Sequence, residues 1–539
     1  MKRYICFIAL LAGMVACKKE TVRKGNDPYQ ETVLPAIYIN KDGISPTRAR
    51  VGEEVLISGK GFEKNKDKLA ILFNGVKAEV ISLTDTTVRV KVPAQAATGN
   101  VAAQVDQQYF FGPFFRVTGV FEMDTLYPSL VGANGAINSI IPVEDGKYLV
   151  VGDFTDYGNS GKKDKLNRVA RINHDGTVDG TFGPDAKNGT NNTVASAVAL
   201  PRSVNGYQYL VAGSFNNYEG VSYVNSIALL NNNGSLSANR IQSPNGKDIT
   251  VSALKGGVSG AVENIHVQPN DGKILLTGNF RFYVQPNFNL KTVGTALDSV
   301  HLDSIQVNGL IRLMPDGGID STYNYDLAKH MGKEGANGFI YRSILLPDGK
   351  LLIAGSFTKY NGQAVNRLAR LNADGSLDAS FTPGAGADQV IGSMERQPDG
   401  KIILTGSFNM YGGVKVPHIV RINENGTIDP GFNVGEGTDG FIYNVGIMPG
   451  GQIILSGVFT QFNKLQRNNM IVLNADGSVH ATYNSFGGFS AVGDNGANGN
   501  ANSVNRVIPQ AGEKSLLVVG SFTKFDFRTA NRIVRITYP

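Results

Sequence analysis

The chain has 539 residues, of which 65 are glycine, 27 phenylalanine and 20 tyrosine, with no tryptophan and a formal net charge of +6. So small a charge excess, without a long basic run between aromatic residues, argues against nucleic acid as a partner. Cys6 and Cys17 are the only cysteines. The remainder of the chain must therefore be stabilised by burial of apolar cores and not by disulfides.

The first residues have the arrangement of an export signal. Lys2 and Arg3 precede an apolar stretch, and Met14-Val15-Ala16 comes directly before Cys17. This stretch is too short to remain as a membrane-spanning helix. It resembles the lipobox of bacterial lipoproteins, which implies that residues 1–16 are a cleaved signal peptide and that Cys17 is lipidated. An ordinary signal peptide with an incidental cysteine is the alternative.

Residues 17–34 then form the lipidated cysteine and a polar tether that has no hydrophobic period. Several acyl chains would anchor the protein stably, at roughly 0.8 kcal/mol for each buried methylene group. Lys18 is not the aspartate that often retains such lipoproteins in the inner membrane. The resemblance therefore implies a lipid-anchored protein of the outer membrane, with the cell surface favoured. The leaflet stays open because Lys18-Lys19-Glu20 departs from the acidic cluster of surface-exported lipoproteins.

Residues 35–118 alternate apolar and polar side chains in short runs, which predicts a sandwich of antiparallel strands. Asn74-Gly75 predicts a two-residue hairpin turn, and Gly59 and Gly61 predict a tight bend before Phe62 enters the core. The segment resembles the IPT/TIG family of immunoglobulin-like domains, which implies a spacer. The resemblance is carried by residues 44–47, 51–62, 71–76, 86–93 and 97–99.

Residues 119–539 repeat an apolar strand that ends in small residues and phenylalanine. The copies end at Phe154, Phe215, Phe280, Phe357, Phe408, Phe459 and Phe522. Each has an inner strand before it, and a third strand, a turn such as Asp374-Gly375 and a short outer strand after it. Four strands in each unit, recurring at about 50 to 75 residues, predict the blades of a propeller. The repeat resembles the delta-60 family, which implies a β-propeller. A β-solenoid is the alternative.

Closure of the ring favours the propeller. The last copy ends at residues 531–536 without an outer strand, and residues 120–126 supply the missing pattern. An N-terminal strand that completes the last blade would leave no open sheet edge. The predicted fold is therefore all-β, with an Ig-like sandwich over residues 35–118 and a seven-bladed propeller over residues 119–539.

This topology sorts the loops by face. Short Asp-Gly turns take one face, here called the turn face, and the lengthened segments take the other, here called the loop face. These segments lie at about 183–193, 281–307, 324–338 and 484–502. Irregular loops on a rigid scaffold usually carry function, so we expect a ligand on the loop face.

Aromatic residues on the loop face are candidates for stacking against sugar rings. They are Phe282, Tyr283, Phe288, Phe339, Tyr341, Phe441 and Tyr443. The alternative is that they only pack loops. Another set of tyrosines follows the repeated phenylalanine by three residues in several copies, and a fixed position of this kind favours packing. This set comprises Tyr157, Tyr218, Tyr360 and Tyr411.

Catalysis has little support in the sequence. The histidines are scattered without metal-ligand spacing, so we expect no metal and no cofactor. Asp374 and Asp378, with their equivalents, could be paired carboxylates or calcium ligands, but their recurrence beside a turn favours hairpin residues.

A tether, an Ig-like spacer and a terminal β domain resemble the surface glycan-binding lipoproteins of the Bacteroidota. The resemblance implies a non-catalytic protein that binds polysaccharide or oligosaccharide beside an outer-membrane glycan importer, and that meets the membrane through its lipid anchor. Because the chain has no tryptophan, tyrosine and phenylalanine would have to provide the stacking surfaces. A protein-interaction or adhesion module is the alternative.

Overall fold

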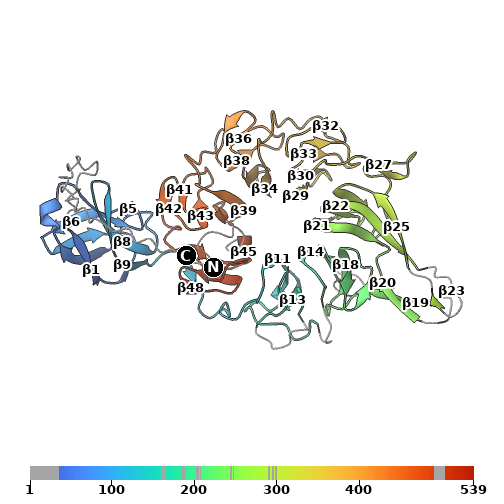
Figure 1. Ribbon diagram of the computed structural model, residues 1–539, viewed down its shortest axis with the longest axis horizontal. Coiled ribbons are helices and arrows are strands. Elements are labelled where there is room, and N and C mark those ends of the chain that lie inside the picture. The colour runs from blue at the N-terminus through green and yellow to red at the C-terminus, as the bar shows by residue number, and fades with distance from the viewer. Residues whose placement is uncertain are drawn as a thin grey trace, which may run out of the picture.

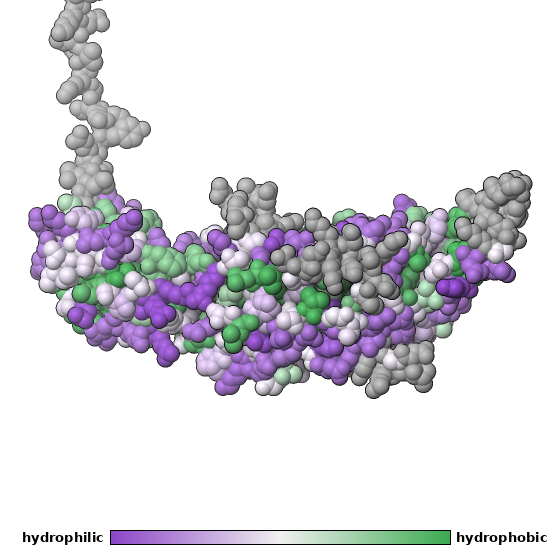
Figure 2. Space-filling model, turned by 90° about the horizontal axis from the view of Figure 1, so that it is seen from below, coloured by the Kyte–Doolittle hydropathy of each residue, from purple (hydrophilic) through white to green (hydrophobic). Residues whose placement is uncertain are grey.

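The computed structural model describes residues 36–539 except 159–165, 184–188, 202–205, 207, 243–245, 247, 289–291, 294–295, 298–299 and 491–503. The predicted signal peptide, Cys17 and the tether lie outside the described residues. Figure 1 shows a ring of small sheets with a sandwich at one side of it, and Figure 2 shows that the molecule is long and flat when turned by 90°. No helix in the described part of the chain is long and apolar enough to cross a membrane.

The sandwich consists of two sheets. The first contains β1 (Tyr38–Ser45), β3 (Glu54–Lys60), β7 (Thr87–Lys91) and β6 (Glu79–Leu83) in that order. The second contains β2 (Arg48–Ala49), β9 (Gln108–Val117), β8 (Gly99–Val105), β4 (Leu69–Phe73) and β5 (Val76–Lys77). A short 3-10 helix, η1 (Glu63–Asn65), follows β3. Phe62 is fully buried between the sheets, and Asn74 and Gly75 both have positive φ in the β4–β5 turn, as predicted.

The ring is built from sheets of the same design, each with an inner, a middle and a third strand. The inner strands are β11 (Ile137–Pro142), β14 (Val194–Ala199), β21 (Gly257–Val267), β29 (Ile340–Leu345), β34 (Ile391–Arg396), β39 (Phe441–Ile447) and β45 (Val504–Pro509). The middle strands are β12 (Tyr148–Gly152), β15 (Gln208–Gly213), β22 (Ile274–Asn287), β30 (Leu351–Gly355), β35 (Ile402–Gly406), β40 (Ile453–Val458) and β46 (Ser515–Gly520). The third strands are β13 (Val169–Ile172), β18 (Ile227–Asn231), β26 (Leu310–Leu313), β33 (Leu368–Leu371), β38 (Ile419–Ile422), β43 (Met470–Leu473) and β49 (Ile533–Thr537).

Short hairpins decorate these sheets. Four loops between the middle and third strands form two-stranded hairpins. These are β16 (Asn217–Tyr218) with β17 (Val221–Ser222), β31 (Lys359–Tyr360) with β32 (Gln363–Ala364), β36 (Met410–Tyr411) with β37 (Val414–Lys415), and β41 (Gln461–Phe462) with β42 (Leu465–Gln466). In the last sheet, the hairpin of β47 (Lys524–Phe525) and β48 (Arg528–Thr529) also pairs with β44 (Phe489–Ser490). The remaining elements are η2 (Glu144–Gly146), β19 (Ala238–Gln242), β20 (Asp248–Ser252), β23 (Thr292–Val293), β24 (Ala296–Leu297), β25 (His301–Gln306), β27 (Tyr325–Asp326) and β28 (Met331–Gly332).

The ring closes on itself. Inner strands contact one another in the order β11, β14, β21, β29, β34, β39 and β45, and β45 contacts β11. In the last sheet, β10 (Glu122–Met123) pairs with β49 and supplies the outer strand, with Glu122 opposite Thr537 and Met123 opposite Ile536. The predicted closing strand is therefore present, and the closed ring confirms a propeller and excludes a β-solenoid.

The repeated Gly-x-Phe signature has a packing explanation. A Cβ atom on Gly355 would lie 1.9 Å from the carbonyl oxygen of Phe339, so no larger residue fits where the middle strand meets the inner one. Phe357 is then fully buried, and the Tyr360 hydroxyl donates a 2.8 Å hydrogen bond to the carbonyl of Gly375. Tyr157, Tyr218 and Tyr411 make the same bond in their own sheets, which confirms their packing role.

The repeated aspartates are structural. Asp374 accepts a hydrogen bond from the backbone N–H of Ser376 at 2.9 Å and so stabilises its turn. Asp378 accepts from Arg370 Nε at 2.7 Å and from Lys350 Nζ at 2.9 Å. The same arginine–aspartate pair recurs as Arg171–Asp179, Arg312–Asp320 and Arg421–Asp429. Among the described residues, no group of three or more His, Cys, Asp and Glu side chains could hold a metal ion.

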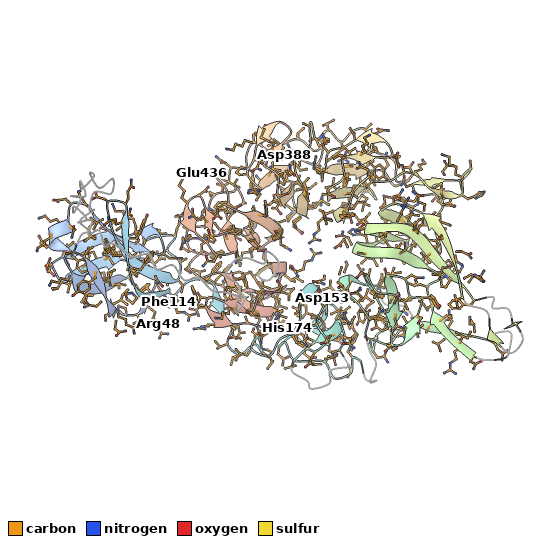
Figure 3. All side chains as sticks on the ribbon, viewed as in Figure 1. Arg48, Phe114, Asp153, His174, Asp388 and Glu436 are labelled. Atoms are coloured by element: carbon orange, nitrogen blue, oxygen red, sulfur yellow. The ribbon has the colours of Figure 1, made fainter. Side chains whose placement is uncertain are left out.

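Direct contacts fix the sandwich to the ring at the domain junction. Arg116 forms a 2.5 Å ion pair with Asp526, and the Thr98 backbone N–H donates to the carbonyl of Ser485 at 2.8 Å. Phe114, labelled in Figure 3, lies edge-on to Phe527 with ring centroids 4.7 Å apart. The sandwich is therefore docked against the last two sheets of the ring.

Candidate functional site

Every inner strand has a β-bulge at the same position near the loop face. In β29, Ile340 faces Gly355 and Arg342 faces Ala354, which leaves Tyr341 as the extra residue. The equivalent extra residues, here called the bulge ring, are Asn138, Ala195, Glu263, Tyr341, Gly392, Tyr443 and Asn505. A bulge redirects a side chain and is frequent beside binding sites. Two of the predicted aromatics, Tyr341 and Tyr443, thus take equivalent places around one axis.

A cavity of about 230 Å³ lies at the mouth of the central channel. Its polar lining includes Asn138, Glu263 and Asn505 of the bulge ring, together with Arg342 and Arg506, which directly follow bulge residues. Figure 3 shows side chains that extend from the inner strands into the middle of the ring. We call this the channel-mouth cavity.

The channel-mouth cavity contains a buried hydrogen-bond donor that has no partner and two further charged groups. Among the described residues, Nε of Arg342 is buried without a partner. Burial, and then the neighbouring Arg506, lower the pKa of Arg342 to about 10, and burial lowers the pKa of Arg506 as well. Burial also raises the pKa of Glu263, an effect that Arg342 partly offsets. Such a site favours a ligand with both hydrogen-bond donors and acceptors.

A second cavity on the loop face, of about 330 Å³, contains the predicted residue Phe339. This ring is 44% exposed, and its centroid lies 6.1 Å from that of Tyr341. Arg281, Asn308 and Asn337 also line the cavity. We call it the Phe339 cavity, and it places an accessible aromatic ring among polar side chains.

Phe441 and Tyr443 repeat this arrangement two sheets further on. Phe441 is also 44% exposed, and Tyr443 is half-buried. The centroids of these two rings are 6.4 Å apart. His418 lies edge-on to Phe441 at 5.7 Å, and burial lowers the pKa of this histidine. His418 is therefore a polar neighbour of this aromatic pair.

One of the other three candidates has a packing role. Tyr283 is buried, and its hydroxyl donates to the carbonyl of Gly317 at 3.1 Å, as the packing tyrosines do. Burial raises the pKa of Tyr283 to about 12. Tyr283 is thus the packing tyrosine of the third sheet, and its position three residues after Phe280 could have shown this. It is not available for stacking.

Phe282 lies on the extended β22 strand, directly after Arg281 of the Phe339 cavity, and Phe288 directly follows this strand. Figure 1 shows that β25, the partner of this extension, lies at the outer edge of the ring, on the side opposite the sandwich. The Cζ atom of Arg281 lies over the Phe282 ring, 5.6 Å from its centroid. The ring centroids of Phe288 and Tyr223 are 6.3 Å apart.

Sequence reasoning missed the charged residues of the channel mouth. Arg342 and Arg506 follow the bulge residues Tyr341 and Asn505, and Glu263 is itself a bulge residue. An alignment of the repeats by their inner strands would have placed Glu263 at the bulge position and both arginines at the position that follows it.

The fold is a β-propeller that is carried next to an Ig-like domain. Residues 42–114 match the model of the IPT/TIG domain. Residues 144–182, 208–236, 346–381 and 397–432 match the model described as domain of unknown function (DUF5122) beta-propeller. These segments of the chain are therefore similar to the IPT/TIG domain and to the DUF5122 beta-propeller.

Solved structures resemble the chain over much of its length but at low identity. An auxiliary nutrient binding protein from Bacteroides thetaiotaomicron VPI-5482 is 12% identical, with 93% of this chain and 97% of that chain covered and a TM-score of 0.30. Another from Bacteroides ovatus ATCC 8483 is 14% identical, with coverages of 93% and 98% and a TM-score of 0.26. A mutant of puromycin hydrolase is 12% identical, covers 75% of this chain and 53% of its own, and has a TM-score of 0.38. Likenesses with such TM-scores support no conclusion about function. No curated protein matches the chain.

Proposed function

We propose that this protein is a non-catalytic binding protein that captures glycan on the loop face of its propeller. The observation that carries the proposal is the Phe339 cavity. A 44% exposed ring stands there 6.1 Å from a tyrosine of the bulge ring. The apolar face of a sugar can stack on such a ring while side chains such as Arg281 bind its hydroxyl groups.

The channel mouth adds polar specificity to this surface. Arg342 and Arg506 offer donors, and Glu263 offers acceptors, within a cavity of about 230 Å³. A glycan that reaches from Phe339 to the mouth would satisfy the buried Nε of Arg342. The repeated Asp374 and Asp378 are engaged in a turn and an ion pair, so binding without catalysis is the function we assign.

The cellular setting in this proposal rests on the N-terminal sequence. Lipidation of Cys17 would tether the propeller to the outer membrane, with the sandwich between anchor and ring. At the cell surface, captured polysaccharide or oligosaccharide would pass to a glycan importer complex in the same membrane. The lipid anchor would be the membrane contact.

Native affinity electrophoresis of residues 18–539, which lack Cys17, tests the proposal. The gels contain soluble fructans, xylans, glucans or mannans, and we expect one of them to retard the protein. Phe339→Ala and Tyr341→Ala should each weaken retardation about tenfold, because each removes a stacking surface. Leu126→Ala, at a 91% exposed apolar residue outside this surface, is the matched control and should leave mobility unchanged.

Two results would contradict the proposal. Equal retardation of wild type and of both aromatic variants would remove the site from the Phe339 cavity. Uniform mobility in every gel would argue for the alternative, a propeller whose loop face binds a partner protein.

A further inference from the structure

A groove between the sandwich and the ring carries aromatic side chains that no part of the proposed site uses. Its volume is about 540 Å³, and both domains line it. The sandwich contributes Tyr109 and Phe111 from β9, and the propeller contributes Gln461, Lys464 and Gln466 from the β41–β42 hairpin. We call this the interdomain groove.

The aromatic pair in this groove is unusually exposed. Phe111 is 72% exposed and Tyr109 is 53% exposed, more than any candidate ring on the loop face. The two ring planes are within 18° of parallel, and their centroids are 6.4 Å apart. Uncovered aromatic surface of this kind is typical of a recognition site.

The strand pairing explains why these rings stay uncovered. Phe111 lies opposite Ala102, and Tyr109 lies opposite Gln104, on the neighbouring strand β8. Alanine is too short to cover the phenylalanine ring from the side. Phe110, between them, turns inward and packs against the core of the sandwich, so the alternation of β9 presents both exposed rings to the same side.

The groove also holds free amides. Among the described residues, the side chains of Asn100, Gln461 and Gln466 form no hydrogen bond, and all three are exposed. None of the lining residues is acidic, and Lys464 is already paired with Glu436 at 2.7 Å. The groove therefore presents uncharged donors and acceptors beside apolar rings.

The two walls of the groove are held in place by the domain junction. The Arg116–Asp526 ion pair and the contact of Phe114 with Phe527, which itself lines the groove, connect the sheet of the sandwich to the propeller. A ligand would thus meet a preformed surface, which lowers the entropic cost of binding.

We propose that the interdomain groove is a second carbohydrate site, which binds an uncharged, extended glycan segment by stacking on Tyr109 and Phe111. The amides of Asn100, Gln461 and Gln466 bind its hydroxyl groups. A protein segment fits less well, because the free groups of the groove are amides and it offers no unpaired charge. The interdomain groove shares no lining residue with the Phe339 cavity, so the two sites can be tested independently.

The test compares two double variants of residues 18–539 in the same polysaccharide gels. Tyr109→Ala/Phe111→Ala removes the groove platform, and Phe339→Ala/Tyr341→Ala removes the loop-face platform. We expect the groove variant to bind about tenfold more weakly than wild type to at least one polysaccharide. Tyr109→Phe, which keeps the ring, should retain binding, and Leu327→Ala, at a 67% exposed residue, is the control for loss of apolar surface.

The outcomes separate the two sites. Loss of binding in the groove variant alone supports the groove and contradicts the loop face. Loss in the loop-face variant alone, with unchanged binding of the groove variant, overturns the present inference and leaves the proposed function standing. Unaltered mobility of wild type in every gel overturns both. Because Tyr109 and Phe111 are exposed, an unchanged circular dichroism spectrum should show that their replacement leaves the fold intact.

Discussion

The ion pair between the third strand and the outer turn should contribute strongly to the stability of the ring. Asp378 and Arg370 are only 7% and 11% exposed at their side chains. Burial raises the pKa of Asp378, but hydrogen bonds from Ser380, Lys350 and Arg370 outweigh this effect and hold the pKa below its usual range. Arg370 also donates to the carbonyl of Glu424 in the next sheet. The pair therefore joins neighbouring sheets.

Asp378→Ala should lower the free energy of unfolding by about 3 kcal/mol. Removal of one partner from a buried pair costs about 3 to 5 kcal/mol, since the remaining charge is left uncompensated. The lower end applies because Arg370 keeps its carbonyl partner and because Lys350 is 30% exposed and can be hydrated. Urea unfolding at neutral pH, followed by circular dichroism, measures the change.

The chain supplies a control and a rescue for this experiment. Asp348 lies 3.8 Å from the same Lys350 but is 57% exposed, so Asp348→Ala should cost at most about 1 kcal/mol. The second sheet has Leu229 where Arg370 stands, so Arg370→Leu in the Asp378→Ala background should recover part of the loss. Equal losses for Asp378→Ala and Asp348→Ala would refute the reasoning.

Two further predictions concern pH and the domain junction. Burial lowers the pKa of His266 to about 4, so between about pH 6.5 and 4 the unfolded chain binds a proton that the folded chain does not. The free energy of unfolding should therefore fall as the pH decreases through this window, by up to about 3 kcal/mol. His266→Gln should flatten this pH dependence, as measured by urea unfolding at a series of pH values. An identical pH profile for the variant and the wild type would contradict the prediction. Arg116→Ala removes the counter-charge of Asp526, whose side chain is only 10% exposed, and so weakens the domain junction. Proteolytic cleavage near residue 118 should therefore become faster. Arg89→Ala, which breaks an exposed ion pair, is the control and should leave the cleavage rate unchanged. Unchanged cleavage of the Arg116 variant would show that other contacts hold the junction.

Local chemistry made much of the fold predictable. Asn74-Gly75 can form a tight hairpin because both residues accept positive φ, and Gly355 recurs because the neighbouring carbonyl leaves no space for a side chain. The strand at Glu122 was predictable as well, since the last repeat lacks an outer strand and a sheet edge requires a partner.

The candidate site was predictable only in part. The structure places Phe339 in a cavity and Tyr341 at the bulge of its inner strand, whereas Tyr283 is a buried packing residue. Arg342 and Arg506 are far apart in sequence, and nothing in either strand alone shows that both line one cavity. That proximity arises when the ring closes.

The sequence by itself determined the all-β class, the repeat and the position of the closing strand, because strand period, turn residues and close backbone contacts are local requirements. The tertiary structure decided which side chains a ligand can reach. Closure of the ring brings Arg342 and Arg506 to one cavity. The sandwich leaves Phe111 exposed beside the propeller, whereas Phe62, in the same domain, is buried. Exposure depends on what other elements cover, and no local pattern contains that information.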